Sequence, residues 1–408
     1  MQNRGVFLIC KPSVKEKIMS TNIKELAKQY EPYITDMRRE FHMHPETSLH
    51  EERTGARVAE ELEKMGIPYV RIAGTGVLGT IKGKFPGKTI ALRADMDAIE
   101  ITEKTGLPFK SQNEGVMHAC GHDSHTAMLL GGAKILNEIK DRLHGTVKLV
   151  FQPAEEVAQG AKRMIAEGAM EGVDEIFGMH VMGDLPAGKI ALHAGPLMAA
   201  VDMFKLTVKG RGGHGSMPNL GVDAVAAASA VVMNLQTIAS REISPMEPVV
   251  VSVGKFVSGT RFNILADEAV LEGTVRCFSH QVRSRIPEAI ERIAKSTAAS
   301  YRAEAELEYT LLTAPVINIE SSVVRARKSV ASILSEDAFV DVSPTTGGED
   351  FSEYMVNTPG VFAFIGVGNE EKDTCYSIHH PKFNVDEDML KIGSALHAQY
   401  AWDFLNEA

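Results

Sequence analysis

The residues from His118 to His125 are the part of the sequence richest in side chains that bind metals or move protons. Three histidines, one cysteine and one aspartate fall within these eight residues, and a glycine separates Cys120 from His122. Imidazole nitrogen, thiolate sulfur and carboxylate oxygen are ligands of borderline divalent cations such as Zn²⁺ or Mn²⁺. Any one of these residues is ordinary in a polar loop, but their density, followed by a helix-like run over 126–139, favours a metal site.

Further metal-binding and acid–base side chains follow predicted strands. Apolar runs predict these strands over 89–94, 146–151, 175–179 and 361–365. The polar residues that follow them in order are Asp95 and Asp97, Glu155 and Glu156, His180, and His379 and His380. Open α/β sheets gather their active sites at the carboxyl ends of their strands, so we expect these side chains to meet.

The adjacent residues Glu155 and Glu156 suit a division of roles at a metal site. Neighbouring carboxylates point in different directions, so one can bind a metal while the other takes a proton from water. His180, level with Glu156 at a strand end, is a candidate metal ligand. Asp97 is a candidate for the carboxylate that orients a metal-binding imidazole, whereas capping of the strand end is the stronger alternative for Asp95.

Length, composition and charge limit the kind of protein. A chain of 408 residues is too long for one compact core, so two domains are expected. Hydrophobic residues make up 44% and charged residues 24%, as in ordinary globular proteins, and no apolar run approaches the roughly 18 residues of a transmembrane helix. The net charge of −10 argues against nucleic acid or an anionic membrane as the main partner.

The cysteines and the N-terminus bear on the compartment. The chain has four cysteines at no disulfide spacing, namely Cys10, Cys120, Cys277 and Cys375. They predict free thiols in a reducing compartment, so we expect a cytoplasmic protein. The apolar segment 5–10 is too short for the core of a secretion signal. Residues 1–18 are interpreted as an N-terminal extension, with a native start at Met19.

The order of strands and helices predicts the fold class and the domains. Two helices are expected over 22–33 and 34–42, and an α/β domain with a largely parallel sheet follows. Between about 197 and 317 the order becomes β-α-β-β-α-β, as in a ferredoxin-like sandwich. The elements expected there are strands over 203–208, 249–257, 269–278 and 304–312 and helices over 223–239 and 281–301. We therefore predict an α/β domain over 19–196 and 318–408, interrupted by an α+β insert over 197–317.

Three polar residues of this insert are candidates for substrate binding. Gly210–Ser216 is rich in glycine but lacks the spacing and the lysine of a phosphate-binding P-loop. It is interpreted as a flexible loop that presents His214 to a ligand. Arg276 suits the binding of a carboxylate and Asn263 the polarisation of a carbonyl, although by composition both are ordinary surface residues.

Together these segments resemble the amidohydrolase branch of the aminoacylase/carboxypeptidase metallohydrolases, which includes hippurate hydrolase and the plant auxin-conjugate hydrolases. The matching segments follow the family's order from Asn22 to Leu405. They are Phe41–Glu46, Arg93–Ala98, Met117–Asp123, Phe151–Glu156, Gly178–His180, Gly210–Ser216, Gly347–Phe351 and His379–Pro381.

The resemblance implies a site with two divalent metal ions per subunit, Mn²⁺ or Zn²⁺, with Co²⁺ or Ni²⁺ as alternatives. The implied ligands are Cys120, His122, Glu156, His180 and His379. Glu155 matches the general base and Asp97 the supporting carboxylate. The implied substrate-binding residues are His214, Asn263 and Arg276, and His214 is also implied in catalysis.

The resemblance also implies an activity and an assembly. The expected reaction is hydrolysis of hippurate-like N-acyl-L-amino acids to a carboxylic acid and a free amino acid. A dipeptidase or carboxypeptidase on the same scaffold is the alternative, while a silent metal-binding protein is disfavoured by the intact Glu155. The insert is expected to be a lid and the interface of a homodimer or higher oligomer, in which His214 serves its own site or the partner's.

Overall fold

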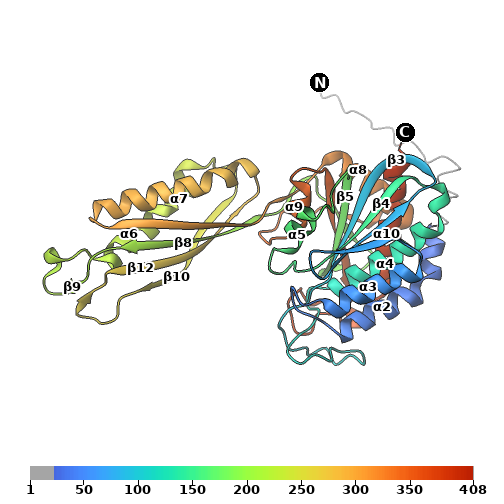
Figure 1. Ribbon diagram of the computed structural model, residues 1–408, viewed down its shortest axis with the longest axis horizontal. Coiled ribbons are helices and arrows are strands. Elements are labelled where there is room, and N and C mark those ends of the chain that lie inside the picture. The colour runs from blue at the N-terminus through green and yellow to red at the C-terminus, as the bar shows by residue number, and fades with distance from the viewer. Residues whose placement is uncertain (1–22, 408) are drawn as a thin grey trace, which may run out of the picture. The chain divides into compact units, whose positions relative to one another are not determined.

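The computed structural model describes residues 23–407, which divide into two compact units (Figure 1). The first unit contains the described residues of Met1–Leu192, Ser321–Asp341 and Gly360–Ala408, and the second contains His193–Glu320 and Val342–Pro359. The predicted insert lies within the second unit, which also includes the segment 342–359 that we assigned to the α/β domain. The assignment of catalytic and lid roles to these parts stays a prediction.

The first unit is built on an eight-stranded sheet in the order β1-β2-β4-β3-β5-β16-β6-β15. The strands are β1 (Tyr69–Ile72), β2 (Gly76–Lys82), β3 (Phe85–Asp95), β4 (His144–Gln152), β5 (Glu175–Pro186), β6 (Ile190–Ala191), β15 (Phe339–Val340) and β16 (Gly360–Gly368). The central strands β4, β3, β5 and β16 are parallel neighbours, and β2 and β6 join them by antiparallel pairing. Every residue of β16 is buried, so the sheet is covered on both faces there.

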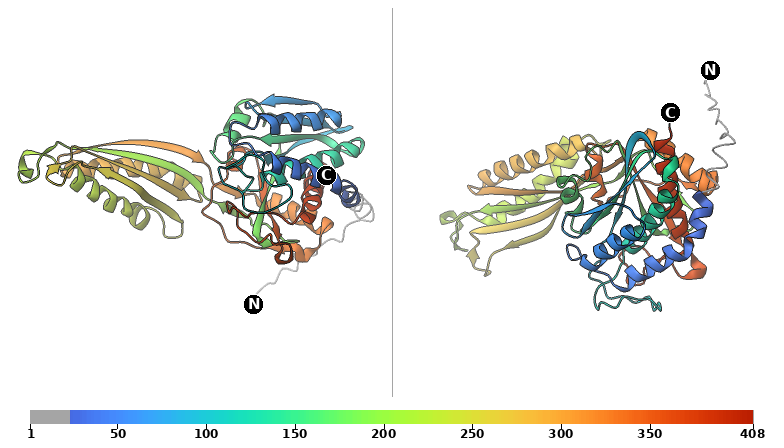
Figure 2. Two further views of the ribbon diagram at one scale, coloured as in Figure 1. Left: turned by 90° about the horizontal axis from the view of Figure 1, so that it is seen from below. Right: turned by 45° about the vertical axis from the view of Figure 1, so that its right-hand side comes forward.

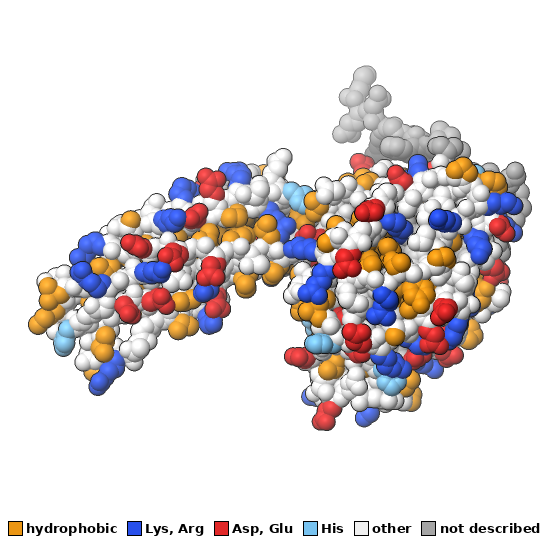
Figure 3. All heavy atoms as spheres, viewed as in Figure 1, with side chains coloured by type: hydrophobic (Ala, Val, Ile, Leu, Met, Phe, Trp, Pro, Cys, Tyr) orange, Lys and Arg blue, Asp and Glu red, His pale blue; other side chains and the backbone are white. Residues whose placement is uncertain are grey.

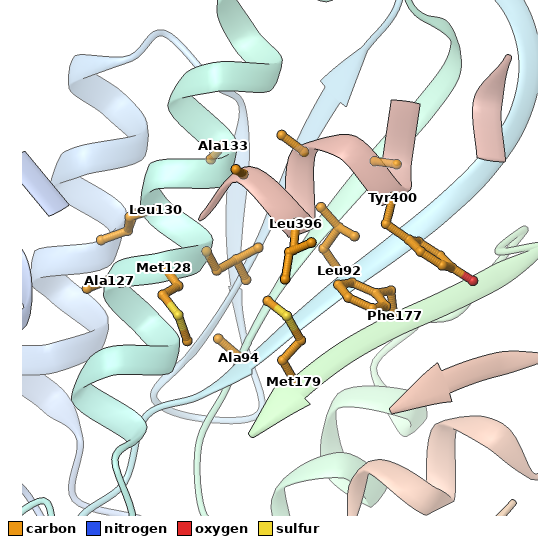
Figure 4. Close-up of a cluster of buried hydrophobic side chains, with 14 of the residues drawn as sticks. Leu92, Ala94, Ala127, Met128, Leu130, Ala133, Phe177, Met179, Leu396 and Tyr400 are labelled. Carbon is orange, nitrogen blue, oxygen red and sulfur yellow. The ribbon is translucent and has the colours of Figure 1, made fainter. Parts of the chain in front are cut away.

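Helices α4 (His122–Glu138) and α10 (Asp388–Leu405) pack side by side against β3 (Figure 4). The side chains labelled in Figure 4 come from β3, β5, α4 and α10 and form part of the main core. Gly131 lets α4 approach its neighbours closely, since a Cβ there would lie 2.3 Å from Ser394 Oγ of α10. The first turn of α4 is thereby held at the carboxyl end of the parallel strands.

The other helices of this unit are shorter or lie further from the site. They are α2 (Glu31–Met43), α3 (Glu52–Lys64), α5 (Gly160–Ala166) and most of α8 (Glu320–Ile333). Residues 23–29 are also helical, as predicted. The predicted start at Met19, the extension 1–18 and Cys10 lie outside the described residues.

The second unit contains a four-stranded antiparallel sheet in the order β10-β12-β8-β13. Helices α6 and α7 pack together against one face of this sheet (Figure 2). The elements are β8 (Ala200–Lys209), α6 (Ala224–Thr237), β10 (Val249–Ser258), β12 (Glu268–Cys277), α7 (His280–Ser300) and β13 (Glu304–Thr313). This is the β-α-β-β-α-β order of the predicted ferredoxin-like insert, so the predicted fold class is confirmed.

The structure corrects the position of His180. We expected this residue to end its strand, but β5 continues for six residues beyond it to Pro186. The reason is that β5 has two neighbours: its pairing with β3 ends at Gly178, whereas its pairing with β16 continues past His180. His180 therefore lies in a part of β5 that still pairs with β16 but no longer pairs with β3.

Two further sequence expectations concern membrane spans and thiols. Within residues 23–407, no helix combines the length and the apolar character needed to cross a membrane. Cys120, Cys277 and Cys375 are free, as predicted for the described part of the chain. A cytoplasmic location stays a prediction.

Candidate metal centre

The predicted ligand side chains of the first unit converge at the carboxyl end of its parallel strands. Their ligand atoms lie within 4.8 Å of one another in overlapping groups. These groups are Cys120 with His122 and His180, Cys120 with Glu156 and His379, and His122 with Glu155 and Glu156. Residues from four separate segments of the sequence thus form one cluster of nitrogen, sulfur and oxygen donors.

Gly121 makes the start of α4 possible. Its φ of +86° is in the left-handed region, which favours glycine, and a Cβ at this position would lie 2.3 Å from Val181 Cγ2. This turn places Cys120 just before the helix and His122 at its first residue. Two non-glycine residues of the cluster's loops, Ala154 before Glu155 and His379 itself, also have positive φ angles, of 56° and 64°. Such strained conformations persist where the surrounding structure holds them, and they concentrate at functional sites.

Asp97 supports both His122 and the Glu155–Glu156 turn. The backbone carbonyl of Asp97 accepts a hydrogen bond from His122 Nδ1 at 2.8 Å. The Asp97 carboxylate accepts from the backbone N–H groups of Glu155 at 3.1 Å and Glu156 at 3.0 Å, and from Ser48 Oγ at 2.6 Å. Burial alone would raise the pKa of Asp97, but these hydrogen bonds and that of His122 lower it below its ordinary value. The carboxylate therefore stays ionised and ties the end of β3 to the loop after β4.

The imidazoles of His122 and His180 are both oriented by their Nδ1 atoms. His180 Nδ1 donates to the carbonyl of Val181 at 2.7 Å, which leaves Nε2 facing Cys120 Sγ at 3.3 Å. His122 Nε2 has no hydrogen-bond partner in the described part of the chain and lies 3.6 Å from Asp95 Oδ2 and 4.0 Å from Glu156 Oε1. Fixing one ring nitrogen so that the other is presented is how proteins orient histidine ligands of metals.

The donor atoms do not all satisfy one another by hydrogen bonds, and a divalent cation would satisfy them. Glu156 Oε1 and His122 Nε2 are buried without a hydrogen bond among the described residues, which is costly unless another group satisfies them. Burial, followed by the charge of Glu156, raises the pKa of the Cys120 thiol, and burial lowers the pKa of His180. A cation would bind the thiolate and the neutral imidazoles, so that its binding and proton release are coupled.

The structure separates the roles of the adjacent residues His379 and His380. His379 Nε2 lies 3.5 Å from Glu156 Oε1, and its backbone N–H donates to the carbonyl of Ala119 at 2.8 Å. His380 instead stacks on the ring of Tyr376 with a centroid distance of 4.7 Å. Only His379 of this pair belongs to the donor cluster.

Three residues that support this site were given no individual role in our sequence interpretation, although His125 belonged to the His118–His125 cluster. Ser48 donates to Asp97, and Arg93 and His125 both hydrogen-bond to Asp95. No sequence signal marks Ser48. His125 stands three residues after His122 on α4, so a helical reading of the cluster places both on one face.

The three candidate residues of the second unit do not form one cluster. His214 is exposed on β9 (Gly213–His214), which pairs with β11 (Ile264–Leu265), and Gly215 N–H donates to the Asn263 carbonyl at 2.9 Å. Arg276 lies opposite Val201, whereas the loop with His214 follows Lys209 at the other end of β8. The eight residue-to-residue steps from 201 to 209, at about 3.3 Å each, separate Arg276 from the His214 end by about 26 Å.

Comparison with known proteins assigns the chain to a family. The model of peptidase family M20/M25/M40 matches residues 91–403. The chain belongs to this family. The predicted resemblance to the aminoacylase/carboxypeptidase metallohydrolases is thereby confirmed, and the chain is an M20 hydrolase of amide or peptide bonds.

Relatives with different names match almost the whole chain. Thermostable carboxypeptidase 2 of Saccharolobus solfataricus is 41% identical over 94% of this chain and 98% of its own. N-acetylcysteine deacetylase of Bacillus subtilis is 40% identical over 92% of this chain and 97% of its own. Among solved structures, the Bacillus subtilis YXEP protein, described as a dinuclear metal binding peptidase of the M20 family, is 37% identical with a TM-score of 0.82 and covers 93% of this chain and 100% of its own.

Proposed function

We propose that this protein is an amidohydrolase that uses two divalent metal ions to cleave N-acyl-L-amino acids into a carboxylic acid and a free amino acid. The observation that carries the proposal is the convergence of Cys120, His122, Glu156, His180 and His379 beside Glu155. The description of the YXEP protein as a dinuclear metal binding peptidase supports a pair of ions here too.

The five converging residues would hold the ions. Cys120 belongs to two of the donor groups, one with His122 and His180 and one with Glu156 and His379. Mn²⁺ or Zn²⁺ suits this mixed set, with Co²⁺ or Ni²⁺ as alternatives. When bound, such ions polarise the amide carbonyl and lower the pKa of the attacking water.

Glu155 is the proposed general base. Its backbone N–H is anchored to Asp97, whose other oxygen anchors Glu156, so the two side chains diverge from a fixed turn. Glu155 would take the proton from water and hand it to the leaving amine. Proton transfer by a positioned carboxylate contributes typically 10²–10⁴-fold to the rate.

His214 and Arg276 are proposed to bind two different groups of the substrate, the oxyanion and the carboxylate. Ser216 N–H donates to His214 Nδ1 at 3.2 Å, so a neutral His214 carries its proton on Nε2 and can donate it to an oxyanion. Arg276 would bind the carboxylate of the amino acid and Asn263 the amide carbonyl. Because Arg276 lies about 26 Å from the His214 end of the same sheet, one small substrate cannot touch both within one chain.

This separation supports a homodimer in which His214 and Asn263 complete the partner's site. The predicted lid role of the second unit and its dimer interface are part of the same proposal. Lid closure would exclude water and complete the site. A cytoplasmic enzyme acting on small soluble amides is consistent with these roles.

A dipeptidase or carboxypeptidase is the second candidate, because the relative at 41% identity is named a carboxypeptidase. A substrate panel separates the two functions. The purified protein would be loaded in turn with Mn²⁺, Zn²⁺, Co²⁺ and Ni²⁺ and offered N-acetyl, N-benzoyl and N-indoleacetyl amino acids beside dipeptides and blocked peptides. We expect faster turnover of the N-acyl amino acids, whereas faster cleavage of the peptides would overturn the proposal.

A further inference from the structure

His125 belongs to the histidine-rich cluster over 118–125, yet both of its ring nitrogens are occupied by protein groups. Nδ1 lies 2.6 Å from Asp95 Oδ1, and Nε2 accepts the backbone N–H of Val181 at 2.9 Å. Since Nε2 is an acceptor, the ring is neutral and carries its proton on Nδ1, which it donates to Asp95. The side chain is only 1% exposed. His125 therefore has no lone pair left for a cation, although its ring lies 4.7 Å from that of His180 and 5.4 Å from that of His122.

The two partners of His125 stand where neighbouring strands separate. β3 and β5 pair in parallel up to Arg93 opposite Gly178, and no backbone pairing between them is present beyond that point within the described residues. Asp95 and Val181 come two and three residues later on these strands. Beyond the last backbone pair, the imidazole of His125 on α4 therefore connects the two strands through its side-chain hydrogen bonds.

Both oxygens of Asp95 take part in buried contacts, and its Oδ2 also lies 3.6 Å from His122 Nε2 of the donor cluster. Its second oxygen accepts from Arg93 Nη1 at 2.6 Å, while Arg93 Nε donates to Gln152 Oε1 of β4 at 2.9 Å. Arg93, Asp95 and Gln152 are all buried. The ends of β4, β3 and β5 are therefore joined by one buried chain of hydrogen bonds that ends on the backbone of Val181. Because satisfied buried networks of this kind specify one geometry, His125 fixes the side of Val181 that faces β3, while pairing with Ile365 of β16 holds its other side.

Val181 transmits that position to the donor cluster. Its carbonyl accepts the hydrogen bond from His180 Nδ1, and its side chain lies against Gly121, between Cys120 and His122. We infer that His125 is a positioning residue that spaces His180 from Cys120 and His122 through the Asp95–His125–Val181 bridge, and that it is not a metal ligand. The inference rests on the proposed metal centre and adds the element that sets its dimensions.

Three variants separate this role from simple core packing. His125→Phe keeps a planar ring but removes both hydrogen bonds, while His125→Gln retains one amide donor and one acceptor for Asp95 and Val181. Asp95→Asn leaves His125 in place, but an amide offers one acceptor where Arg93 and His125 require two, and it also changes the 3.6 Å contact with His122 Nε2, so it is read together with the two His125 variants. His397→Phe is the matched control, because His397 is equally buried on α10, contacts Phe177 and makes no hydrogen bond through Nδ1 to any described residue.

The test is a titration of each apo protein with Co²⁺, followed by its thiolate-to-cobalt absorption and by competition with a chromogenic chelator. Loss of a partner that orients a ligand typically weakens metal binding by about 10–100-fold. We expect that loss, with altered cobalt bands, for His125→Phe and Asp95→Asn, and binding within a few-fold of the parent for His125→Gln and His397→Phe. Circular dichroism identifies any variant that does not fold, and Asp95→Asn and His125→Gln then decide the question.

The outcomes distinguish the inference from the proposed function. If the parent protein binds no Co²⁺ through its thiolate, the metal centre itself is wrong. If the parent binds two ions and folded His125→Phe or Asp95→Asn binds them with unchanged affinity and spectrum, only the positioning role is overturned. A drop to one ion with His125→Gln as well as His125→Phe, without change in Asp95→Asn, would show that His125 is a ligand and would also overturn the inference.

Discussion

The donor cluster of the first unit and the candidate substrate-binding residues of the second unit are held in contrasting ways. In the first unit, parallel strands bring their carboxyl ends to one edge, and Asp97 and the Asp95–His125 pair lock the side chains there through buried hydrogen bonds. In the second unit, antiparallel strands place successive loops at opposite ends, so Arg276 and His214 are far apart and His214 is exposed. A parallel sheet gathers the loops that follow its strands at one edge, whereas an antiparallel sheet distributes them over two opposite edges.

The largest effect is expected in the donor cluster of the first unit. Glu155→Gln removes the proposed base but leaves the five donor residues, so turnover should fall by about 10²–10⁴-fold or more while both ions are retained. Metal analysis beside steady-state kinetics measures this. Glu156→Gln is the matched control, since it removes a proposed ligand and should lower metal content as well. Near-normal activity of Glu155→Gln, or metal loss equal to that of the control, would contradict the assignment.

The next effect tests whether the second unit completes another subunit's site. His214→Ala should keep both ions and lose about 10²–10³-fold in turnover, as for removal of an oxyanion donor. Mixing inactive His214→Ala with inactive Glu155→Gln should restore part of the activity as hybrid dimers form. Mixing Arg276→Ala with His214→Ala should restore part of the activity in the same way. Lys209→Ala, at the end of β8, is the control and should remain active. A monomeric enzyme with full activity in sedimentation and kinetic assays would exclude action in the partner's site.

A smaller effect is expected from one methyl group at the start of α4. Gly121→Ala brings a Cβ against Val181 and should weaken metal binding by about 10–100-fold, because both Cys120 and His122 must shift. Gly66→Ala is the matched control: its φ of +66° is also left-handed, but no atom lies within 4 Å of the added Cβ. Both variants should lose about 1–2 kcal/mol of stability in urea unfolding from the backbone conformation. Equal metal affinities of the two variants would show that Gly121 is needed only for its backbone conformation and not for the placement of Cys120 and His122.

The smallest effect is expected from an exposed charge on the second unit, to be contrasted with a buried one; Figure 3 shows basic and acidic side chains interspersed on the visible face. Lys205 pairs with Glu308 at 2.8 Å on the exposed side of the sheet, and Lys205→Ala should leave the urea midpoint unchanged. Asp202 is fully buried, forms an ion pair with Arg283 at 2.6 Å and accepts from Tyr309 at 3.0 Å. Asp202→Ala should cost about 3–5 kcal/mol, since it leaves a buried cation without its partner. Similar midpoints for the two variants would contradict this contrast.

Local patterns predicted the elements well. The expected helices over 223–239 and 281–301 correspond to α6 and α7, and the apolar runs correspond to strands within a few residues of the expected bounds, except that β5 extends seven residues beyond the run over 175–179. Apolar periodicity and turn residues act over short distances along the chain, so a single sequence carries this information. The same patterns placed the polar residues at strand ends, and the family resemblance named which of them to expect together.

The sequence by itself determined the α/β class, the ferredoxin-like insert, the family and the residue types of the candidate centre. Only the tertiary structure decided that His180 lies inside β5, that His380 stacks on Tyr376, and that His125 bridges Asp95 to Val181. It also decided that Arg276 and His214 lie at opposite ends of one sheet. These outcomes depend on where neighbouring strands diverge and on which way each side chain turns. Both are set by long-range packing, which the local sequence pattern does not encode.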